Sequence, residues 1–402
     1  MPVKVKYLIL GGGPSGLILA ANLLKSGEKS FLILEKENEP GGLCRSREID
    51  HSMLDIGGGH FLDVRNRKVL DFVFGFLPEN EWERFDRISK IRTPKFEIDY
   101  PYEANIWQLP VDEQIEHLKS ISNAGSNIGR RQPEKFSEWI TWKLGSVIAH
   151  NYMLPYNSKI FSDVRLDKLG TYWLYKLPNV SFEDTLRSCL LNKPCGTLPA
   201  HSQFYYPRKY GYGEVFSRIA DFIGKDKILL NYSVKTIEVD HLGVNNEIFA
   251  EKIITTIPWP ELLTSRSIPV EIRRIIRQLR YSSIDITYRS SNQSTNAHWT
   301  YFPDENLPYH RLLFRHNFIA GAKGYWEETN SRRVVDGQPC THHNEYAYPI
   351  NTRHKPEVIL KIMDWAKSFS IFSLGRWGEW EHMNSDVAMN RAINLADHLV
   401  SA

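Results

Sequence analysis

The sequence has few cysteines, little net charge and no long apolar run, and each absence excludes a class of protein. The four cysteines form no CxxC pair and no metal-ligand spacing with histidine, which predicts free thiols in a reducing compartment and no metal site. A net charge of +3 over 402 residues does not indicate nucleic acid or an anionic membrane surface as a partner. The N-terminal apolar run, YLIL, is too short for a signal peptide or a membrane span. We therefore expect a cytoplasmic protein that binds neither nucleic acid nor a membrane.

The N-terminal segment has the pattern of a dinucleotide-binding β-α-β unit. Residues 3–10 and 31–34 are predicted to be buried strands, with a helix over 14–25 between them. The strand-to-helix turn carries the G-x-G-x-x-G motif Gly11, Gly13 and Gly16. Glycine lets the backbone N–H groups of such a turn approach a pyrophosphate at the helix N-terminus. Glu35 ends the second strand, where a carboxylate can accept hydrogen bonds from an adenosine ribose; the alternative is a structural turn beside a surface glutamate.

Two more glycine clusters follow, EPGGLCRS at 39–46 and LDIGGGHF at 54–61. A second close approach of the backbone to the cofactor would explain them. The cofactor-binding residues predicted from these opening segments are Gly11, Gly13, Pro14, Ser15, Gly16, Glu35, Lys36, Gly42, Leu43, Gly58 and Gly59.

Beyond residue 65 the pattern changes, and the predicted fold class is α/β. We expect a discontinuous Rossmann-like FAD-binding domain (1–65, 200–275 and 350–402), a helical insertion that forms a substrate domain (66–199) and an antiparallel-sheet substrate domain (276–349). Residues 321–344 are predicted to be a mobile loop. A cofactor domain interrupted in this way is typical of flavoproteins and argues against a simple NAD dehydrogenase.

Several further motifs share an order along the chain. They are FDRISKIR (85–92), IDYPYEANIWQLP (98–110), LPYNSKIF (154–161), FYYPRKYGYGEVF (204–216), WTYFPDENLPYHR (299–311), YAYPI (346–350) and GRWGEWEHMNSD (375–386). Together they resemble the UDP-galactopyranose mutases, especially the eukaryotic-type branch, whose flavin fold is shared with the amine oxidases. The resemblance implies a non-redox use of reduced FAD, in which flavin N5 attacks the anomeric carbon of an NDP-hexose. The covalent adduct opens and recloses, so that pyranose and furanose forms interconvert, as in cell-surface polysaccharide biosynthesis.

The resemblance also implies roles for individual residues. Arg311 ends the best-matching motif and would stabilise the departing diphosphate, since a guanidinium offers fixed donors to a developing charge; alone, it would be read as a surface ion pair. His60 would lie beside the flavin, although DIGGGH has one more glycine than the family pattern. The remaining implied substrate-binding residues are Tyr100, Tyr102, Asn157, Tyr301 and Tyr348. The remaining implied flavin-binding residues are Gly375, Arg376, Asn384, Ser385 and Asp386.

Two positions depart from the family pattern, and both concern the part of the site that would hold the diphosphate and the sugar. Lys176 lies near the place of a second arginine, and lysine is not an equivalent bidentate clamp. His382 stands where the family has a tyrosine. We predict catalytic roles for Arg311, His60 and Lys176, and substrate binding by His382.

Other functions stay open on the sequence alone. The main alternative is an FAD-dependent oxidoreductase of the amine-oxidase or protoporphyrinogen-oxidase type, and another is a non-catalytic flavoprotein that binds a nucleotide sugar. A mutase would need an external reductant, for which NAD(P)H is a candidate. The sequence does not fix the homo-oligomeric state.

Overall fold

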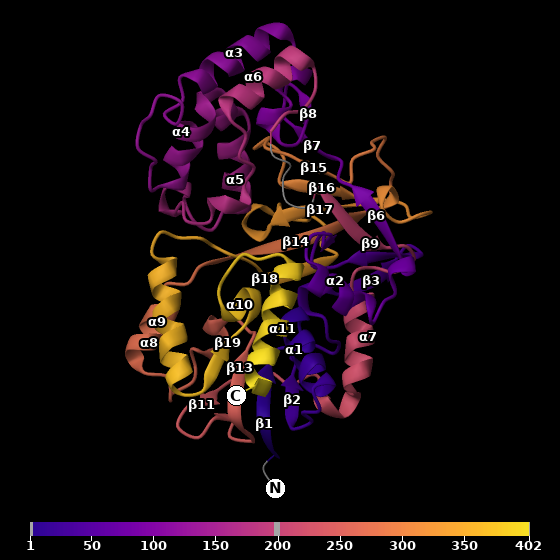
Figure 1. The fold of residues 1–402 in the computed structure, drawn as a ribbon, viewed down its shortest axis with the longest axis vertical. Coiled ribbons are helices and arrows are strands. Elements are labelled where there is room, and N and C mark those ends of the chain that lie inside the picture. Colours follow the sequence, from indigo (N-terminus) through magenta and orange to yellow (C-terminus); the bar gives the residue numbers. More distant parts are fainter. Residues whose placement is uncertain (1–2, 197–201, 402) are drawn as a thin grey trace.

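The computed structural model describes residues 3–196 and 202–401, and most of its strands lie in two seven-stranded sheets (Figure 1). The first sheet has the order β10-β2-β1-β13-β12-β11, with β19 paired to β13. Its parallel strands are β1 (Val3–Leu10), β2 (Phe31–Leu34), β10 (Ile228–Leu229), β13 (Ile248–Thr255) and β19 (Ile371–Ser373). Its short antiparallel strands are β11 (Ile237–Glu238) and β12 (Gly243–Val244).

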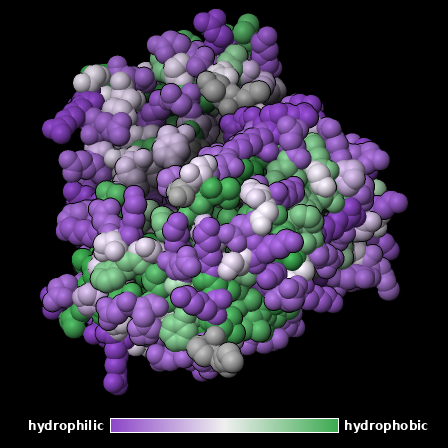
Figure 2. Space-filling model, turned by 60° about the horizontal axis from the view of Figure 1, so that its bottom comes forward, coloured by the Kyte–Doolittle hydropathy of each residue, from purple (hydrophilic) through white to green (hydrophobic). Residues whose placement is uncertain are grey.

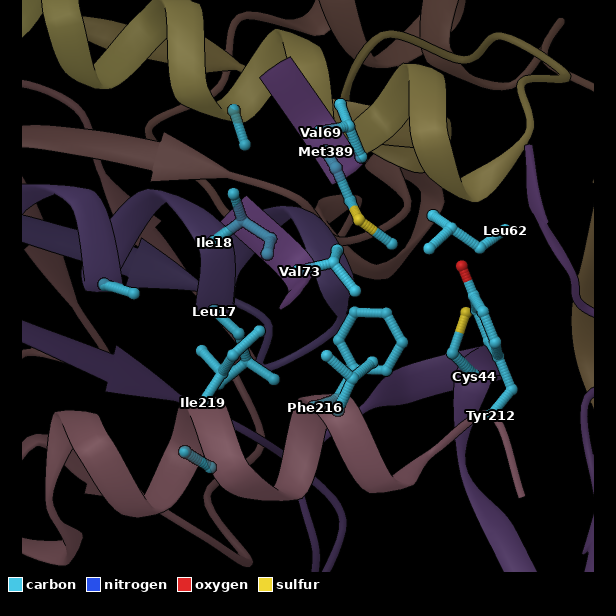
Figure 3. Packing of buried hydrophobic residues seen from close by; sticks show 14 of the residues in the cluster. Leu17, Ile18, Cys44, Leu62, Val69, Val73, Tyr212, Phe216, Ile219 and Met389 are labelled. Carbon is cyan, nitrogen blue, oxygen red and sulfur yellow. The ribbon is translucent and has the colours of Figure 1, made fainter. Parts of the chain in front are cut away.

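Helices cover both faces of this sheet, because its strands are apolar on both sides. Along β1 the side chains alternate: Ile9 packs in one core cluster, while Leu8 and Leu10 pack in another. The first cluster contains α1 (Pro14–Lys25), α7 (Glu214–Ile223) and α11 (Ser385–Ser401). Figure 3 shows part of it, in which Leu17 and Ile18 of α1 lie near Ile219 of α7 and Met389 of α11. The second cluster contains α8 (Val270–Ile276) and α9 (Lys355–Ser368).

The second sheet has the order β18-β14-β17-β16-β15-β7-β8 and is antiparallel except between β15 and β7. Its strands are β7 (Ser89–Arg92), β8 (Glu97–Asp99), β14 (Tyr281–Arg289), β15 (Trp299–Tyr301), β16 (Arg311–Phe314), β17 (Tyr325–Asn330) and β18 (His342–Pro349). Smaller sheets pair β3 (Ser46–Ile49) with β4 (Ser52–Asp55), and β9 (Gln203–Pro207) with both β5 (Leu62–Asp63) and β6 (Trp82–Asp86).

A group of helices with its own core lies beyond the second sheet, at the top of Figure 1. It contains α3 (Val111–Ser122), α4 (Phe136–Ile148), α5 (Leu154–Ile160) and α6 (Phe182–Leu191). The short helices α2 (Arg67–Phe74) and α10 (Gly375–Gly378) belong to the lower part of the molecule (Figure 1).

The predicted α/β fold class with a Rossmann-like domain is confirmed, and two details differ from expectation. Residues 66–199 also contain strands β6 to β8, and β7 joins the second sheet through β15. The segment 321–344 is not a loop throughout, because β17 and the start of β18 lie within it. The domain boundaries themselves stay predictions.

One face of the molecule is mainly hydrophilic, with hydrophobic side chains gathered mostly in its lower half (Figure 2). Across residues 3–196 and 202–401, no helix combines the length and the apolar character needed to cross a membrane. The same residues contain no cluster of three or more His, Cys, Asp or Glu side chains able to hold a metal ion.

Candidate active site

The turn from β1 to α1 forms one end of a cavity of about 400 Å³. Gly11 has φ +102°, a backbone conformation that residues other than glycine rarely adopt, and Gly13 precedes the first residue of α1. The N-cap residue is Gly13, which has no side chain to cap the helix, and Gly13, Pro14 and Ser15 line the cavity, so the positive end of the helix dipole lies at the cavity wall. Gly16 lies behind the turn, where a Cβ would come within 2.1 Å of the Gly11 carbonyl oxygen. The motif thus combines a tight turn with close helix–strand packing.

Glu35 lies beside this turn with its carboxylate held by backbone donors. It accepts hydrogen bonds from the N–H groups of Gly12 (2.7 Å) and Glu37 (2.9 Å). Burial raises the pKa of Glu35 against the effect of these hydrogen bonds. The carboxylate also lines the cavity, where its remaining lone pairs can accept hydrogen bonds from ribose hydroxyls.

The rest of this cavity is built by segments far apart in sequence. The second glycine cluster packs against the first, with Gly41 N–H donating to Gly12 O at 2.8 Å. Other walls come from the segment after β10, the end of β13, β18 and the α10–α11 region. The residues expected from the sequence that line this cavity are Gly11, Gly13, Pro14, Ser15, Glu35, Lys36, Gly42, Leu43, His60, Arg376, Asn384 and Ser385.

A second cavity of about 160 Å³ adjoins the first. Four residues line both cavities: His60, Arg376, Asn384 and Ser385. Residues of the second sheet and of the C-terminal segment complete the second cavity, and those expected from the sequence are Gly59, Tyr301, Arg311, Tyr348 and His382.

His60 lies at the junction of the two cavities. Burial and the charge of Arg376 lower its pKa to about 3, so the imidazole is neutral near pH 7. Its Nδ1 lies 3.0 Å from the Gly58 carbonyl oxygen, which only accepts hydrogen bonds. Nδ1 therefore carries the proton, and Nε2 is left as an acceptor.

Arg311 lines the second cavity but is already paired with a carboxylate. Its Nε and Nη2 donate to the two oxygens of Glu328 at 2.6 and 2.8 Å. Burial opposes the charge of this guanidinium, but Glu328 raises the pKa of Arg311 above its ordinary value. The arginine is therefore charged and rigidly oriented, with Nη1 left to contact a ligand.

Arg376 is held differently, by carbonyl groups alone. Its guanidinium donates to Met383 O at 2.8 Å and to Ala347 O at 3.1 Å. No carboxylate lies within salt-bridge distance of it in the described part of the chain. Burial lowers the pKa of Arg376, but a guanidinium stays protonated near pH 7, so a positive charge faces both cavities.

Arg87 is a further arginine of the second cavity that the sequence analysis did not single out. It donates to Tyr301 Oη at 3.1 Å and to Ser89 Oγ at 2.9 Å, and its guanidinium lies 4.4 Å from the centre of the Tyr100 ring. Trp299 also donates to Tyr301 Oη, at 2.8 Å. Because Tyr301 Oη already accepts two hydrogen bonds, its own proton is available to a ligand. The motif FDRISKIR contains Arg87, but no spacing rule distinguishes one arginine in the short connection between β6 and β7.

Tyr348 and His382 form a stacked pair in the wall of this cavity, with ring centres 4.8 Å apart. Burial raises the pKa of Tyr348, so its phenol is protonated near pH 7 and can donate a hydrogen bond. The pair therefore presents polar ring atoms next to Arg311 and Arg376.

Other expected site residues lie outside both cavities. Tyr100 packs behind Tyr301, which lines the second cavity, with the two ring centres 5.4 Å apart. Tyr102 is a core residue whose hydroxyl contacts His117 Nε2 at 3.1 Å. Asn157 is buried and donates to Met153 O at 2.7 Å. Asp386 lies in the first turn of α11, one residue after its start. The others outside the cavities are Gly16, Gly58 and Gly375.

Lys176 cannot be placed against the second cavity. It ends a 3₁₀ turn, Leu174–Lys176, and its side chain lies outside the described part of the structure. Its predicted catalytic role stays a prediction.

Comparisons with known proteins show which domain family and which whole proteins this chain resembles. Residues 9–74 match the family of NAD(P)-binding Rossmann-like domains. A UDP-galactopyranose mutase of Mycoplasma pneumoniae is 35% identical over 82 residues, 20% of each chain. A UDP-galactopyranose mutase of Mycoplasma genitalium is 20% identical over 98% of this chain and 94% of its own. An uncharacterized protein from the nifH2 3′ region of Methanothermococcus thermolithotrophicus is 49% identical over 22% of this chain and 91% of its own.

Solved structures extend the similarity to the whole fold. A reduced UDP-galactopyranose mutase superimposes with a TM-score of 0.86 at 22% identity, over 99% of this chain and 94% of that one. A cyclohexylamine oxidase from Brevibacterium oxydans superimposes less well, with a TM-score of 0.65 at 14% identity over 99% of each chain. The resemblance to the UDP-galactopyranose mutases, within the wider amine-oxidase fold, is thus confirmed.

Proposed function

We propose that this protein is a flavin-dependent nucleotide-sugar mutase that interconverts the pyranose and furanose forms of UDP-galactose or a related NDP-hexose. The observation that carries the proposal is the second cavity. Three arginines (Arg87, Arg311 and Arg376) line it, together with two tyrosines. It adjoins the first cavity, of about 400 Å³, which reaches the N-terminus of α1 and is called the long cavity below. Converging cations and phenols suit a diphosphate, whereas an amine oxidase needs an apolar pocket for its substrate.

FAD fits the long cavity as the cofactor. The uncapped N-terminus of α1 suits a pyrophosphate, and the buried Glu35 suits an adenosine ribose. Arg376, Asn384 and Ser385 would then lie where the flavin end meets the second cavity. In its reduced form the cofactor would supply the nucleophile for the anomeric carbon, and NAD(P)H is a suitable external reductant.

The protein's own residues would hold and stabilise the leaving nucleotide. Arg311 and Arg376 are fixed before the ligand arrives, so little reorganisation accompanies the appearance of charge on the diphosphate. Tyr301 would donate its remaining proton to a phosphate oxygen. The neutral His60 would accept a hydrogen bond at Nε2 beside the reacting atoms.

A nucleotide panel tests this proposal and names the substrate class. Flavin-loaded protein would be titrated with UDP, GDP, CDP and dTDP and with their hexoses, and binding followed by flavin fluorescence. We expect saturable binding of UDP-hexoses, weakened but still measurable in Arg311→Ala and unchanged in Arg289→Ala, whose arginine pairs with Glu327 instead. Absence of binding to every nucleotide, together with bleaching of the oxidised flavin by an amine, would assign the protein to the oxidases.

A further inference from the structure

Glu328 occupies a position between the two halves of the proposed site. It lies on β17 directly opposite Arg311 of β16, and its residue is only 1% exposed. One carboxylate oxygen, Oε1, accepts both from Arg311 Nη2 (2.8 Å) and from the backbone N–H of Gly59 (3.2 Å). The same carboxylate therefore contacts the substrate-side arginine and the glycine turn that lines the junction of the cavities.

The glycine turn is shaped around this carboxylate. Gly58 has φ +93°, and a Cβ at this position would come within 2.6 Å of Glu328 Oε1. His60 follows in the same turn and faces both cavities. The absence of side chains at 58 and 59 thus allows the turn to contact a buried charge.

The other neighbour of Glu328 does not compete for its charge. His310 Nε2 lies 3.6 Å from the carboxylate. Burial and the charge of Arg311 lower the pKa of His310 well below its usual value, so its ring is neutral and forms no ion pair. Among the described residues, Arg311 is the cation paired with Glu328, and a buried carboxylate binds such a partner firmly because leaving either charge unpaired would be costly.

We infer that Glu328 is a positioning residue that fixes the guanidinium of Arg311 and the turn Gly58–His60 relative to each other. The inference rests on the proposed function only for the ligand that Arg311 contacts. Glu328 lines neither cavity and would touch no substrate atom itself. Because Glu328 holds both, the diphosphate-binding Arg311 and the flavin-side turn Gly58–His60 move as one unit.

A double-mutant cycle on the flavin-loaded protein tests the inference. We expect Glu328→Gln to weaken UDP binding about tenfold in the wild-type background and less than about twofold in the Arg311→Ala background, because the residue acts through the arginine. The matched control is Glu327→Gln, the next residue of β17, which pairs with Arg289 and should change UDP binding less than about twofold. Equal losses in both backgrounds, or no loss in either, would overturn the inference.

A second readout does not depend on any substrate. Hydrogen–deuterium exchange of the peptide that covers residues 57–61 should be faster in Glu328→Gln than in wild type or Glu327→Gln, since the Gly59 N–H loses a charged acceptor. Unchanged exchange there would contradict the inference even if UDP binding fell. If wild type binds no UDP, the proposed function fails, and this exchange measurement still decides the role of Glu328. If Glu328→Gln does not fold, Glu328→Asp, which keeps the charge but retracts it, should show the same two effects.

Discussion

At the residue scale, Arg311 has two roles: it pairs with the buried Glu328, and it lines the second cavity, where it can contact a ligand. In the pair with Glu328, Nε and Nη2 of Arg311 donate to the carboxylate, whose negative charge offsets the positive charge of the arginine. The pairing also fixes the guanidinium plane before a ligand arrives, which lowers the cost of ordering it on binding. The positive field of the second cavity then depends also on Arg87 and Arg376.

Replacing Arg311 tests this division of labour. Arg311→Ala should lower kcat/KM by roughly 100-fold or more, because a preorganised donor to the leaving group is lost. Flavin content should stay unchanged, since Arg311 does not line the long cavity. Steady-state kinetics and absorbance at the flavin bands check both parts. An unchanged rate in Arg311→Ala would remove the central assignment, and Arg289→Ala serves as the control.

At the element scale, the packing of α1 on β1 decides whether the cofactor cavity forms. The Cβ of Gly16→Ala would lie 2.1 Å from the backbone oxygen of Gly11, and backbone yields less readily than a side chain. We expect a loss of about 1–3 kcal/mol in unfolding free energy and a lower flavin content. Urea unfolding and flavin quantification measure these effects. Gly75→Ala, where φ is −67° and the nearest atom is 3.2 Å away, should be tolerated; equal behaviour of the two variants would refute the packing argument.

A buried carboxyl joins β4 to β3, to β9 and to the turn before α7, and makes stability depend on pH. Asp55 at the end of β4 accepts hydrogen bonds from Ser46 Oγ, Tyr206 Oη and the Tyr212 N–H. Burial nevertheless raises its pKa from 3.8 to about 7. The folded state therefore holds this proton more tightly than the unfolded state, and the resulting stability is complete below about pH 4 and lost as pH rises through about 7.

Asp55→Asn should flatten this dependence. Between about pH 4 and pH 7 the wild type should lose up to about 1.4 kcal/mol per pH unit more than the variant. Urea midpoints measured at several pH values give the difference. Burial also raises the pKa of Glu103 to about 7. Its effect on the pH dependence of stability is the same in both proteins and cancels in the comparison. Asp71→Asn, which removes the carboxylate of an exposed pair with Arg67, is the control. If the stability of Asp55→Asn depended on pH as strongly as that of wild type, Asp55 would be excluded as the source.

The elements that the sequence predicts best are those whose pattern is local. The first β-α-β unit and its glycine turn appear where the periodicity and the G-x-G-x-x-G spacing place them. Strand β17 was missed because residues 321–344 are rich in turn formers and charges, and its strand character comes from pairing with β14 and β16 far along the chain. Glu328 was missed with it. A sequence pattern cannot show which distant strands will flank a short polar segment.

At the scale of the whole molecule, one fold serves different chemistries, so the site must decide the function. The same architecture superimposes on a UDP-galactopyranose mutase and on amine oxidases. The feature of this chain that bears on this decision is the charged second cavity, to which β15, β16, β18 and the α10–α11 region all contribute residues. The two cavities adjoin because the second sheet lies directly against the Rossmann-like domain (Figure 1).

The most direct test is turnover of UDP-galactofuranose by the flavin-loaded protein, fully reduced by dithionite without oxygen and, in parallel, left oxidised. Chromatography would follow the appearance of UDP-galactopyranose, with the other nucleotide hexoses assayed alongside. Our account predicts ring-form isomerisation in the reduced sample only, with no net consumption of reductant per product formed. Absence of isomerisation for every sugar, with oxygen uptake by the oxidised protein on an amine or another reduced substrate, would contradict it.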